Sequence, residues 1–336
     1  MRAVRIAQGP EFACADNDPL LRAGLRAGLG FPYECNAGSC GTCKVELLEG
    51  QVTSLRPDAP GLNDRDRAKN RVLACQARPG TDCRVKVRLR PENVPVHRPA
   101  KFRAKLTGFH DLTHDLREFT FKTEGAPGFL PGQYALFYLP GLEAPRTYSM
   151  SNTDDGSGTW QFIVRRVPGG TGTVTLFDKV EAGSTITLDG PYGLAYLRPE
   201  SPRDIVLIGG GSGLAPMLSL ARGAVAEPRL DGRKIHVFYG ARTTRDLCGS
   251  AELEALPGYG SRITFTPVLS HHGNDSVETW AGAKGFVHEI ARDFVAERWN
   301  DFEYYFAGPP PMAEAVQRML MDKRVPFPQV HFDSFY

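Results

Sequence analysis

The sequence predicts a chain of several domains, α+β in architecture at the N-terminus and α/β at the C-terminus. Three observations lead to this prediction. Its 336 residues exceed one ordinary domain, since length suggests a domain for every ~150 residues. Short β-prone runs recur at regular intervals in the middle of the chain, which is typical of an antiparallel barrel or sandwich. Towards the C-terminus, apolar strands alternate with helical patterns, which is typical of a parallel sheet covered by helices.

The composition indicates a globular protein and excludes two classes of function. Hydrophobic residues make up 41% of the chain and charged residues 23%. The 40 basic and 38 acidic residues leave a net charge of +2, which argues against bulk nucleic-acid binding. No apolar run approaches the ~18 residues of a membrane span, and the first residues lack the apolar core of a secretory signal. We therefore expect a cytoplasmic monomer with no membrane or nucleic-acid partner.

The cysteine spacing predicts a metal centre near the N-terminus. Three of the seven cysteines form the pattern C-x4-C-x2-C, and a fourth follows in the segment R-V-L-A-C-Q. This is the plant-type [2Fe–2S] spacing, in which soft thiolates hold the iron. A zinc site or unligated thiols are the alternatives, although zinc usually takes a second close pair of ligands, which this segment lacks. The expected iron ligands are Cys35, Cys40, Cys43 and Cys75.

The residues around these cysteines support a cluster. Gly38 and Gly41 permit a positive φ and let backbone N–H groups approach anionic sulfurs. The other three cysteines, Cys14, Cys83 and Cys248, are expected to be small buried hydrophobic residues.

The flanking segments predict a β-grasp domain over residues 1–92. A turn at Gly9–Pro10 separates two short strands, and Asp18 is expected to cap a helix whose leucines recur at helical spacing. Residues 83–90 alternate apolar and basic side chains, which predicts a strand with its basic row in solvent. The proline-rich residues 93–100 are expected to be a linker.

Residues 101–200 predict an antiparallel β-barrel domain. Six β-prone runs are separated by Gly, Pro and Asp turns. Four short signals lie between or within them: P-G-Q-Y at 131–134, R-T-Y-S at 146–149, V-P-G-G-T-G-T at 167–173 and G-P-Y-G at 190–193. A glycine-rich segment that opens a helix offers N–H groups to an anion such as a phosphate. Each signal alone also has a plain explanation, such as a hairpin turn.

Residues 201–336 predict a parallel α/β domain. An apolar strand runs into the glycine-rich turn 209–214, and a helical pattern follows. Such glycines let the backbone approach a pyrophosphate, while the helix N-terminus adds positive partial charge. The segments Y-G-A-R and A-G-P-P-P-M also lie at expected strand ends, where parallel sheets bind ligands.

These motifs, in this order, resemble the ferredoxin–NADP reductase superfamily with an N-terminal plant-type ferredoxin domain. This arrangement is that of the reductase components of multicomponent bacterial oxygenases, and the resemblance covers nearly the whole chain. It implies a [2Fe–2S] cluster, FAD and NADH as cofactors, and an enzyme that passes electrons from NADH through FAD to the cluster. It also implies a terminal oxygenase or an intermediate ferredoxin as partner, reached through the surface around residues 37–42.

The chemistry of the cofactors leads to the same order. NADH delivers a hydride, whereas an iron–sulfur cluster accepts one electron at a time, and a flavin can do both. No 2-His-1-carboxylate or Rieske pattern is visible in the chain, so we expect the oxygen chemistry in a partner. Two alternatives stay open: a stand-alone diaphorase that reduces a small molecule, and a redox-sensing regulator.

The resemblance also assigns roles to single residues. Tyr148 would lie against the flavin ring, the Ser149 hydroxyl near its N5 atom, and Phe335 would cover the ring; these three are the expected catalytic residues. Where many relatives have Cys before G-P-P, this chain has Ala307. The expected cofactor-binding residues are Arg146, Thr147, Tyr148, Ser149, Ile163, Val164, Arg165, Gly170, Gly172, Thr173, Gly210, Gly211, Ser212, Gly213, Arg242, Gly308, Pro309 and Phe335.

The nucleotide preference is expected to be for NADH. The adenosine ribose would lie beyond the Y-G-A-R strand, where Arg242 and Arg245 suit a 2′-phosphate and Asp246 opposes one. This local charge is mixed, and the resemblance favours NADH.

Overall fold

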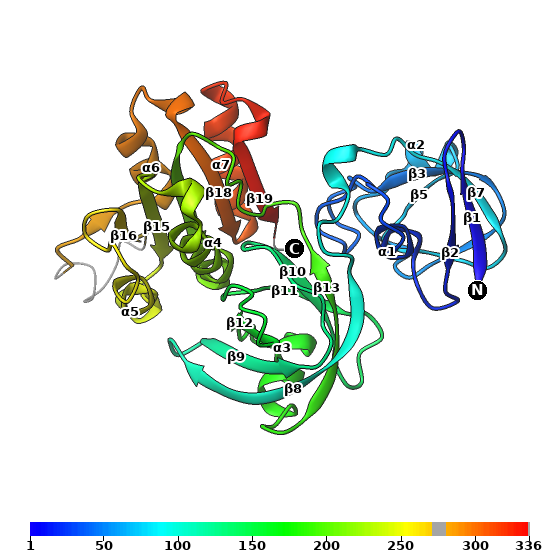
Figure 1. The fold of residues 1–336 in the computed structure, drawn as a ribbon, viewed down its shortest axis with the longest axis horizontal. Coiled ribbons are helices and arrows are strands. Elements are labelled where there is room, and N and C mark those ends of the chain that lie inside the picture. The colour runs from blue at the N-terminus through cyan, green and yellow to red at the C-terminus, as the bar shows by residue number, and fades with distance from the viewer. Residues whose placement is uncertain (271–279, 335–336) are drawn as a thin grey trace.

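The protein, seen in a computed structural model, is described over residues 1–270 and 280–334. In Figure 1 the N-terminal domain, in blue and cyan, lies on the right, the green barrel lies below, and the yellow-to-red α/β domain lies at the upper left. The part described contains one five-stranded sheet, two six-stranded sheets and one two-stranded sheet. Each larger sheet belongs to one of the three domains, as the sequence predicts.

The N-terminal domain has the predicted β-grasp architecture. Its sheet has the order β2-β1-β7-β3-β5, in which β1 pairs antiparallel with β2 and parallel with β7. Helix α1 packs its leucines into the core beneath the sheet. The elements are β1 (Arg2–Ile6), β2 (Glu11–Cys14), α1 (Leu20–Arg26), β3 (Lys44–Glu49), β4 (Val52–Ser54), α2 (Asp64–Ala68), β5 (Arg71–Leu73), β6 (Ala77–Pro79) and β7 (Cys83–Lys86).

The start of α1 corrects the sequence prediction. Pro19 occupies the N-cap position, and no side chain caps the helix. The Asp18 carboxylate instead contacts Arg26 at 2.6 Å and Lys101 at 2.9 Å. Two charge-assisted contacts are stronger than one bond to a backbone N–H, which explains why Asp18 turns away from the helix.

The predicted strand over residues 83–90 is shorter than expected. Strand β7 ends at Lys86, because its neighbours offer no further pairing there. The alternation still holds, since Val87 and Leu89 pack against the core while the basic side chains stay exposed.

The central domain is a nearly closed antiparallel barrel with the strand order β11-β10-β13-β8-β9-β12. A bridge between Met150 and Phe162 joins the end of β11 to β12 and so closes the ring. Buried aromatic side chains fill the barrel, among them Trp160 and Phe162. The elements are β8 (Ala100–Asp111), β9 (Leu116–Thr123), β10 (Tyr134–Tyr138), β11 (Arg146–Ser149), β12 (Thr159–Arg165), α3 (Thr171–Asp178) and β13 (Thr185–Tyr192).

The C-terminal domain is a parallel sheet with helices on both faces. Its order is β17-β16-β15-β14-β18-β19, and all its pairings are parallel. Alternate residues of β14 enter two cores: Leu207 packs with α4, and Ile208 packs with α6 and α7. The elements are β14 (Asp204–Gly210), α4 (Leu214–Ala226), β15 (Ile235–Ala241), α5 (Ser250–Glu254), β16 (Ile263–Leu269), β17 (Ala283–Lys284), α6 (Val287–Val295), β18 (Phe302–Gly308), α7 (Pro310–Asp322) and β19 (Val330–Ser334).

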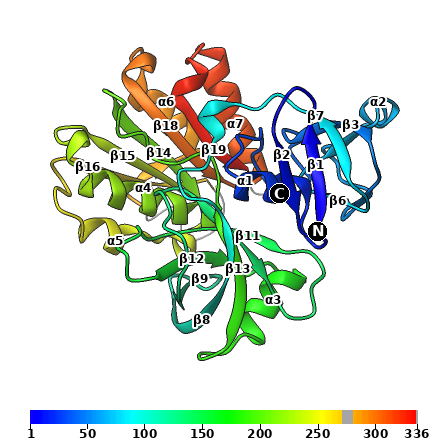
Figure 2. The same ribbon diagram turned by 45° about the vertical axis from the view of Figure 1, so that its right-hand side comes forward.

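The last strand was not predicted as part of the sheet. β19 pairs with β18 from Val330 to Ser334, and Figures 1 and 2 both show its end near the N-terminal domain. The end of this strand therefore lies near the place where all three domains meet, since Asp333 lines a cavity together with residues of each domain. None of the helices in the described ranges is long and apolar enough to cross a membrane.

Candidate active site

The four predicted iron ligands lie together at one side of the N-terminal domain. Cys35, Cys43 and Cys75 are buried, and Cys40 is half-buried. The backbone N–H groups of Ala37 and Cys40 donate to Cys35 Sγ at 3.5 and 3.4 Å. Gly38 and Gly41 have φ values of 87° and 75°, as a loop that turns its N–H groups towards sulfur requires.

The chemistry of these side chains fits a [2Fe–2S] cluster. A hydrogen bond from Cys40 lowers the pKa of the Cys35 thiol to about 6, and one from Cys43 lowers the pKa of Cys75. The four thiols therefore interact in two pairs, Cys35 with Cys40 and Cys43 with Cys75, and in each pair the hydrogen bond that lowers one pKa raises that of its partner. Asn36 Nδ2 is buried and has no hydrogen-bond partner among the described residues, so it is a donor that an anionic cluster could satisfy.

The remaining cysteines have no such surroundings. Burial raises the pKa of Cys14 to about 12 and that of Cys248 to about 11, and it also raises the pKa of Cys83. These three side chains stay protonated at neutral pH. Cys14 and Cys83 are buried, as predicted, whereas Cys248 is half-buried and its sulfur lies 3.4 Å from Tyr239 Oη.

A cavity of about 550 Å³ opens beside the cluster loop, between the barrel and the α/β domain. Strand β11 supplies the whole R-T-Y-S motif to its wall, and β12 supplies Ile163 and Arg165. The wall consists of Cys35, Ala37, Tyr134, Arg146, Thr147, Tyr148, Ser149, Ile163, Arg165, Val167, Gly170, Thr171, Gly172, Thr173, Gly210, Gly211, Ser212, Pro309 and Asp333. Most of the residues predicted to hold FAD are therefore brought together around one space.

The two expected catalytic residues of β11 face this space. Tyr148 is half-buried, and the edge of its ring packs at 80° against Phe137, with the ring centroids 4.9 Å apart. Burial raises the pKa of Tyr148 to about 12, so the phenol stays neutral. The Ser149 side chain is buried in the same wall, 4% exposed.

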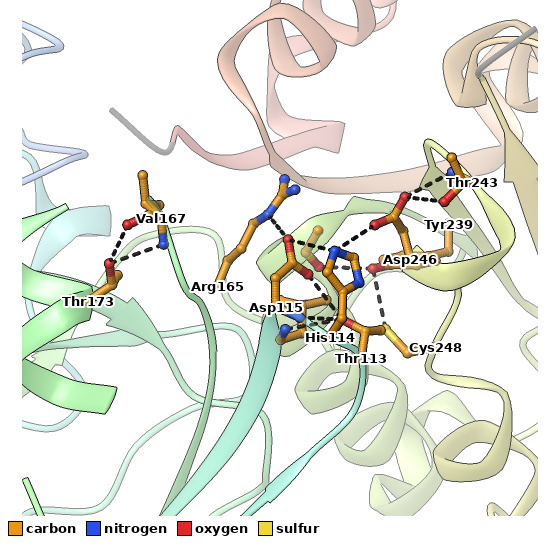
Figure 3. Close-up of polar contacts among 12 residues, drawn as sticks. Thr113, His114, Asp115, Arg165, Val167, Thr173, Tyr239, Thr243, Asp246 and Cys248 are labelled. Carbon is orange, nitrogen blue, oxygen red and sulfur yellow. Dashed lines mark hydrogen bonds and ion pairs between the residues drawn. The ribbon is translucent and has the colours of Figure 1, made fainter. Parts of the chain in front are cut away.

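The glycine-rich segment 167–173 also contributes to the wall of the flavin cavity. Helix α3 begins at Thr171 with Gly170 as its N-cap, and Arg146 Nη2 donates to Thr171 Oγ1 at 3.4 Å. The Thr173 hydroxyl accepts a bond from Val167 N–H at 3.1 Å, so it fastens the turn (Figure 3). A guanidinium beside a helix N-terminus is the arrangement that a pyrophosphate requires.

A buried carboxyl at the cluster end of the cavity was missed by the sequence analysis. Asp333 of β19 is 6% exposed, and its Oδ2 atom has no hydrogen-bond partner among the described residues. Burial, with a smaller contribution from the charge of Glu34, raises the pKa of Asp333 to about 8. No pattern in the sequence marks this residue, because its place depends on β19 joining the sheet.

A second cavity of about 490 Å³ lies over the C-terminal ends of the parallel strands. It includes Arg242 and Asp246 of the predicted nucleotide site, together with Phe286, His288 and Met312. The two cavities share four wall residues, which are Arg165, Gly210, Gly211 and Pro309. A nucleotide in the second cavity would therefore meet a flavin in the first.

Three of the predicted cofactor-binding residues that the structure describes do not line either cavity, and a fourth is not described. Val164 points into the barrel core, as strand alternation requires between Ile163 and Arg165. A Cβ at Gly213 would lie 2.0 Å from Ala307 O, and one at Gly308 would lie 3.1 Å from Gly210 O. These two glycines therefore let the turn and β18 approach each other closely. Phe335, the fourth, lies outside the described residues.

A row of polar side chains, three of them acidic or basic and one a histidine, crosses from the barrel to the α/β domain at the boundary of the two cavities (Figure 3). Arg165 Nε contacts Asp115 Oδ2 at 2.7 Å. His114 Nε2 lies 4.0 Å from Asp115 Oδ2 and 3.8 Å from Asp246 Oδ1. The sequence analysis missed His114 and Asp115, since they become part of the site only when the two domains pack together.

Family profiles match the three domains in the expected order. The 2Fe-2S iron-sulfur cluster binding domain matches residues 5–80, the oxidoreductase FAD-binding domain matches residues 103–196, and the oxidoreductase NAD-binding domain matches residues 207–318. The finer boundaries at residues 92, 100 and 200 stay predictions.

The sequence similarity to known proteins extends over nearly the whole chain. The ferredoxin–NAD(P)+ reductase CarAd of Metapseudomonas resinovorans is 39% identical, over 96% of both chains. The ferredoxin–NAD+ reductase component of an alkene monooxygenase system from Xanthobacter autotrophicus is 36% identical, over 99% of this chain and 100% of its own.

Solved structures agree. A ferredoxin reductase in carbazole 1,9a-dioxygenase superposes with a TM-score of 0.90 at 36% identity, covering 100% of this chain and 98% of its own. The Amycolatopsis cytochrome P450 reductase GcoB gives a TM-score of 0.87 at 32% identity, with 100% and 99% covered.

The fold and the joined cavities define an iron–sulfur flavoprotein oxidoreductase. The chain belongs to the ferredoxin–NAD(P) reductase family with an N-terminal [2Fe–2S] domain, whose members named above are reductase components. Its cofactors are a [2Fe–2S] cluster, FAD and NADH, which confirms the prediction made from the motifs.

Proposed function

We propose that the protein is the NADH-dependent reductase component of an oxygenase system and delivers electrons to a terminal oxygenase or an intermediate ferredoxin. One observation carries this proposal. The flavin cavity reaches the cluster ligand Cys35 at one end and shares four wall residues with the nucleotide cavity at the other. The names of the similar proteins support the kind of partner, since they are reductases of dioxygenase and monooxygenase systems. The monomeric state stays a prediction.

The chain's own residues bind and orient the reactants. When bound, FAD accepts a hydride from NADH and gives single electrons to a [2Fe–2S] cluster. Gly210 and Gly211 bring backbone to the boundary of the two cavities, where a nicotinamide and a flavin would meet. In the wall of the flavin cavity, the Ser149 hydroxyl is a hydrogen-bonding group and Tyr148 offers an aromatic surface. Arg146, beside the start of α3, would hold the pyrophosphate of FAD.

The nucleotide cavity supports a preference for NADH. Asp246 lines it and is held in place, because Thr243 N–H and the Thr243 hydroxyl each donate to Asp246 Oδ2 at 2.9 Å. A fixed carboxylate accepts a bond from a free 2′-hydroxyl and repels a 2′-phosphate. Arg242 and Arg245 are both exposed, and of the two only Arg242 lines this cavity.

We expect the kcat/KM ratio of NADH over NADPH to exceed about 10, equal to about 1.4 kcal/mol of transition-state preference. Steady-state ferricyanide reduction with each nucleotide measures it. Replacing Asp246 with Asn should lower the ratio, because the repulsion of the 2′-phosphate is removed. A ratio below one in the wild-type protein would reverse the assignment and make Arg242 and Arg245 the first residues to examine.

The electron order is tested by removing the cluster. Cys40→Ser should abolish NADH-driven cytochrome c reduction while ferricyanide reduction by the flavin persists; Cys248→Ser is the matched control. Cytochrome c reduction at the wild-type rate in a Cys40→Ser protein without iron would contradict the order. NADH turnover with and without a purified oxygenase component then tests the partner. The turnover rate of a stand-alone diaphorase would not rise when the oxygenase component is added.

A further inference from the structure

A buried arginine joins the cluster loop to the flavin domain. Arg22 of α1 is 3% exposed. Its Nε donates to Asn36 Oδ1 at 3.3 Å, and its Nη1 donates to Tyr138 Oη at 2.9 Å. Asn36 directly follows the ligand Cys35, and Tyr138 lies on barrel strand β10. One guanidinium therefore touches both the cluster loop and the barrel, a pair of contacts that its planar fork suits.

The contact with Tyr138 continues into a buried ionic network. Tyr138 Oη donates to Asp189 Oδ2 at 3.4 Å, and Arg26 Nη2 contacts Asp189 Oδ1 at 2.7 Å. Asp189 is fully buried, 0% exposed. Arg26 also contacts Asp18 at 2.6 Å, and Lys101 contacts Asp18 at 2.9 Å. The network thus spans the junction of the N-terminal domain and the barrel.

The charges of this network do not balance among the described residues. Two carboxylates, Asp18 and Asp189, face three cations, Arg22, Arg26 and Lys101. The carboxylates make their ion pairs with Arg26 and Lys101, whereas the hydrogen bonds of Arg22 go to a neutral amide and a neutral hydroxyl. Within the part of the chain described, Arg22 has no carboxylate at ion-pair distance, so no ion pair neutralises its positive charge.

The field of this charge reaches the cluster ligands. The guanidinium lies against the cluster loop, because Arg22 Nε donates to Asn36 Oδ1 at 3.3 Å and Asn36 directly follows the ligand Cys35. A cluster with four thiolate ligands is anionic, and reduction adds a further negative charge. A nearby cation that cannot lose its proton stabilises the reduced form more than the oxidised form.

We propose that Arg22 is a positioning residue for electron transfer, which holds a permanent positive charge beside the [2Fe–2S] cluster and fastens the cluster loop to the flavin domain. It raises the reduction potential of the cluster and keeps Cys35 at the end of the flavin cavity. This inference rests on the proposed function, because it concerns the step from FAD to the cluster.

Redox titration of the purified holoprotein, followed by the EPR signal of the reduced cluster, tests the charge. Arg22→Gln should lower the equilibrium constant for cluster reduction about tenfold, which is about 59 mV for one electron. Arg22→Lys keeps the charge and should keep the wild-type potential. The control is Arg5→Gln, which removes an exposed arginine on β1 that pairs with Glu11. A wild-type potential in Arg22→Gln, or an equal loss in Arg22→Lys, would overturn the role of the charge.

Tyr138→Phe tests the fastening and leaves every charged residue of the network in place. It removes the hydroxyl between Arg22 and the barrel and keeps the ring, so the protein should fold and hold its cluster. Stopped-flow reduction by NADH should show slower electron arrival at the cluster, with flavin reduction and cluster potential unchanged. An unchanged rate would overturn the fastening. A wild-type cluster that dithionite reduces but NADH does not would contradict the proposed function instead, whatever the variants do.

Discussion

At the scale of single residues, the chemistry of the flavin cavity depends on a few polar side chains in its wall, and Ser149 is one of them. Its buried side chain lies on the R-T-Y-S strand, in the wall of the flavin cavity. Ser149→Ala should slow flavin reduction by NADH ~10- to 1,000-fold, the usual cost of losing one positioned hydrogen bond at a reacting centre. Stopped-flow absorbance measures the rate. Ser151→Ala, buried outside the wall, is the control, and equal rates for Ser149→Ala and wild type would leave Ser149 as a strand residue.

Asp333 gives the protein a pH dependence with a defined sign. Burial raises its folded-state pKa from 3.8 to about 8, so the folded protein binds more protons than the unfolded chain between these values. Stability therefore falls as the pH rises through this window and levels off above it. A pKa difference of one is worth about 1.4 kcal/mol, so the loss amounts to a few kcal/mol.

Asp333→Asn should remove most of this dependence and stabilise the protein above pH 8, where wild-type Asp333 is ionised. Chemical denaturation of the protein without FAD at pH 5 and pH 9 measures it. An equal fall in both proteins would show that other groups set the pH dependence.

The site residues that were predicted from the sequence are those whose motif lies within one short segment. The four cysteines and the R-T-Y-S strand each carry their spacing within a short segment, so the pattern alone located them. Asp333, His114 and Asp115 escaped prediction because nothing near them in the sequence is unusual, and only the packing of separate domains brings them to the site.

At the scale of elements, the approach of the glycine turn to β18 shapes the nucleotide cavity. A Cβ at Gly213 would lie 2.0 Å from Ala307 O, a backbone atom that cannot move aside. Gly213→Ala should push α4 away from β18 and destabilise the domain by ~1–3 kcal/mol. We expect the Kd for NAD+ to rise at least about tenfold, as measured by fluorescence titration. Gly108→Ala, which meets nothing within 4 Å, is the control; normal affinity in Gly213→Ala would mean that the turn adapts.

Elements were predicted well where a period or a motif defined them. The barrel strands and the alternating strands and helices of the last domain follow from their hydrophobic patterns. The predicted cap of α1 was wrong, because Asp18 pairs with Arg26 at the far end of the same helix and with Lys101 of the barrel. β19 was not predicted, since a short strand at the edge of a parallel sheet is defined by its neighbour β18 and not by its own sequence.

At the scale of the whole molecule, the three sites follow one another in space in the order of the domains along the chain. The cluster domain comes first and the nucleotide domain last, and β19 of the nucleotide domain also brings Asp333 beside the cluster loop, where Asp333 and Cys35 line one cavity. The flavin site lies between them in space because the barrel contributes the strands that face both neighbours. Covalent linkage holds the three sites at high effective concentration, so electron transfer does not wait for an encounter.

The stability of this arrangement should depend on Asp189, which links the N-terminal domain to the barrel. Its carboxylate is fully buried and accepts bonds from Arg26 and Tyr192 at 2.7 and 2.8 Å. Asp189→Asn removes the charge at nearly constant shape, and it leaves Arg26 partly unpaired at a cost of about 3 kcal/mol. We expect calorimetry of the holoprotein to show the N-terminal domain unfolding at a lower temperature, separate from the barrel. Asp231→Asn, an exposed residue of the α/β domain with a 3.7 Å contact to Arg262, should leave the profile unchanged. If the Asp189→Asn protein still unfolds at the wild-type temperature, the two domains are held together by their apolar contacts, such as Tyr134 and Leu136 against the N-terminal core, and not by the ionic network.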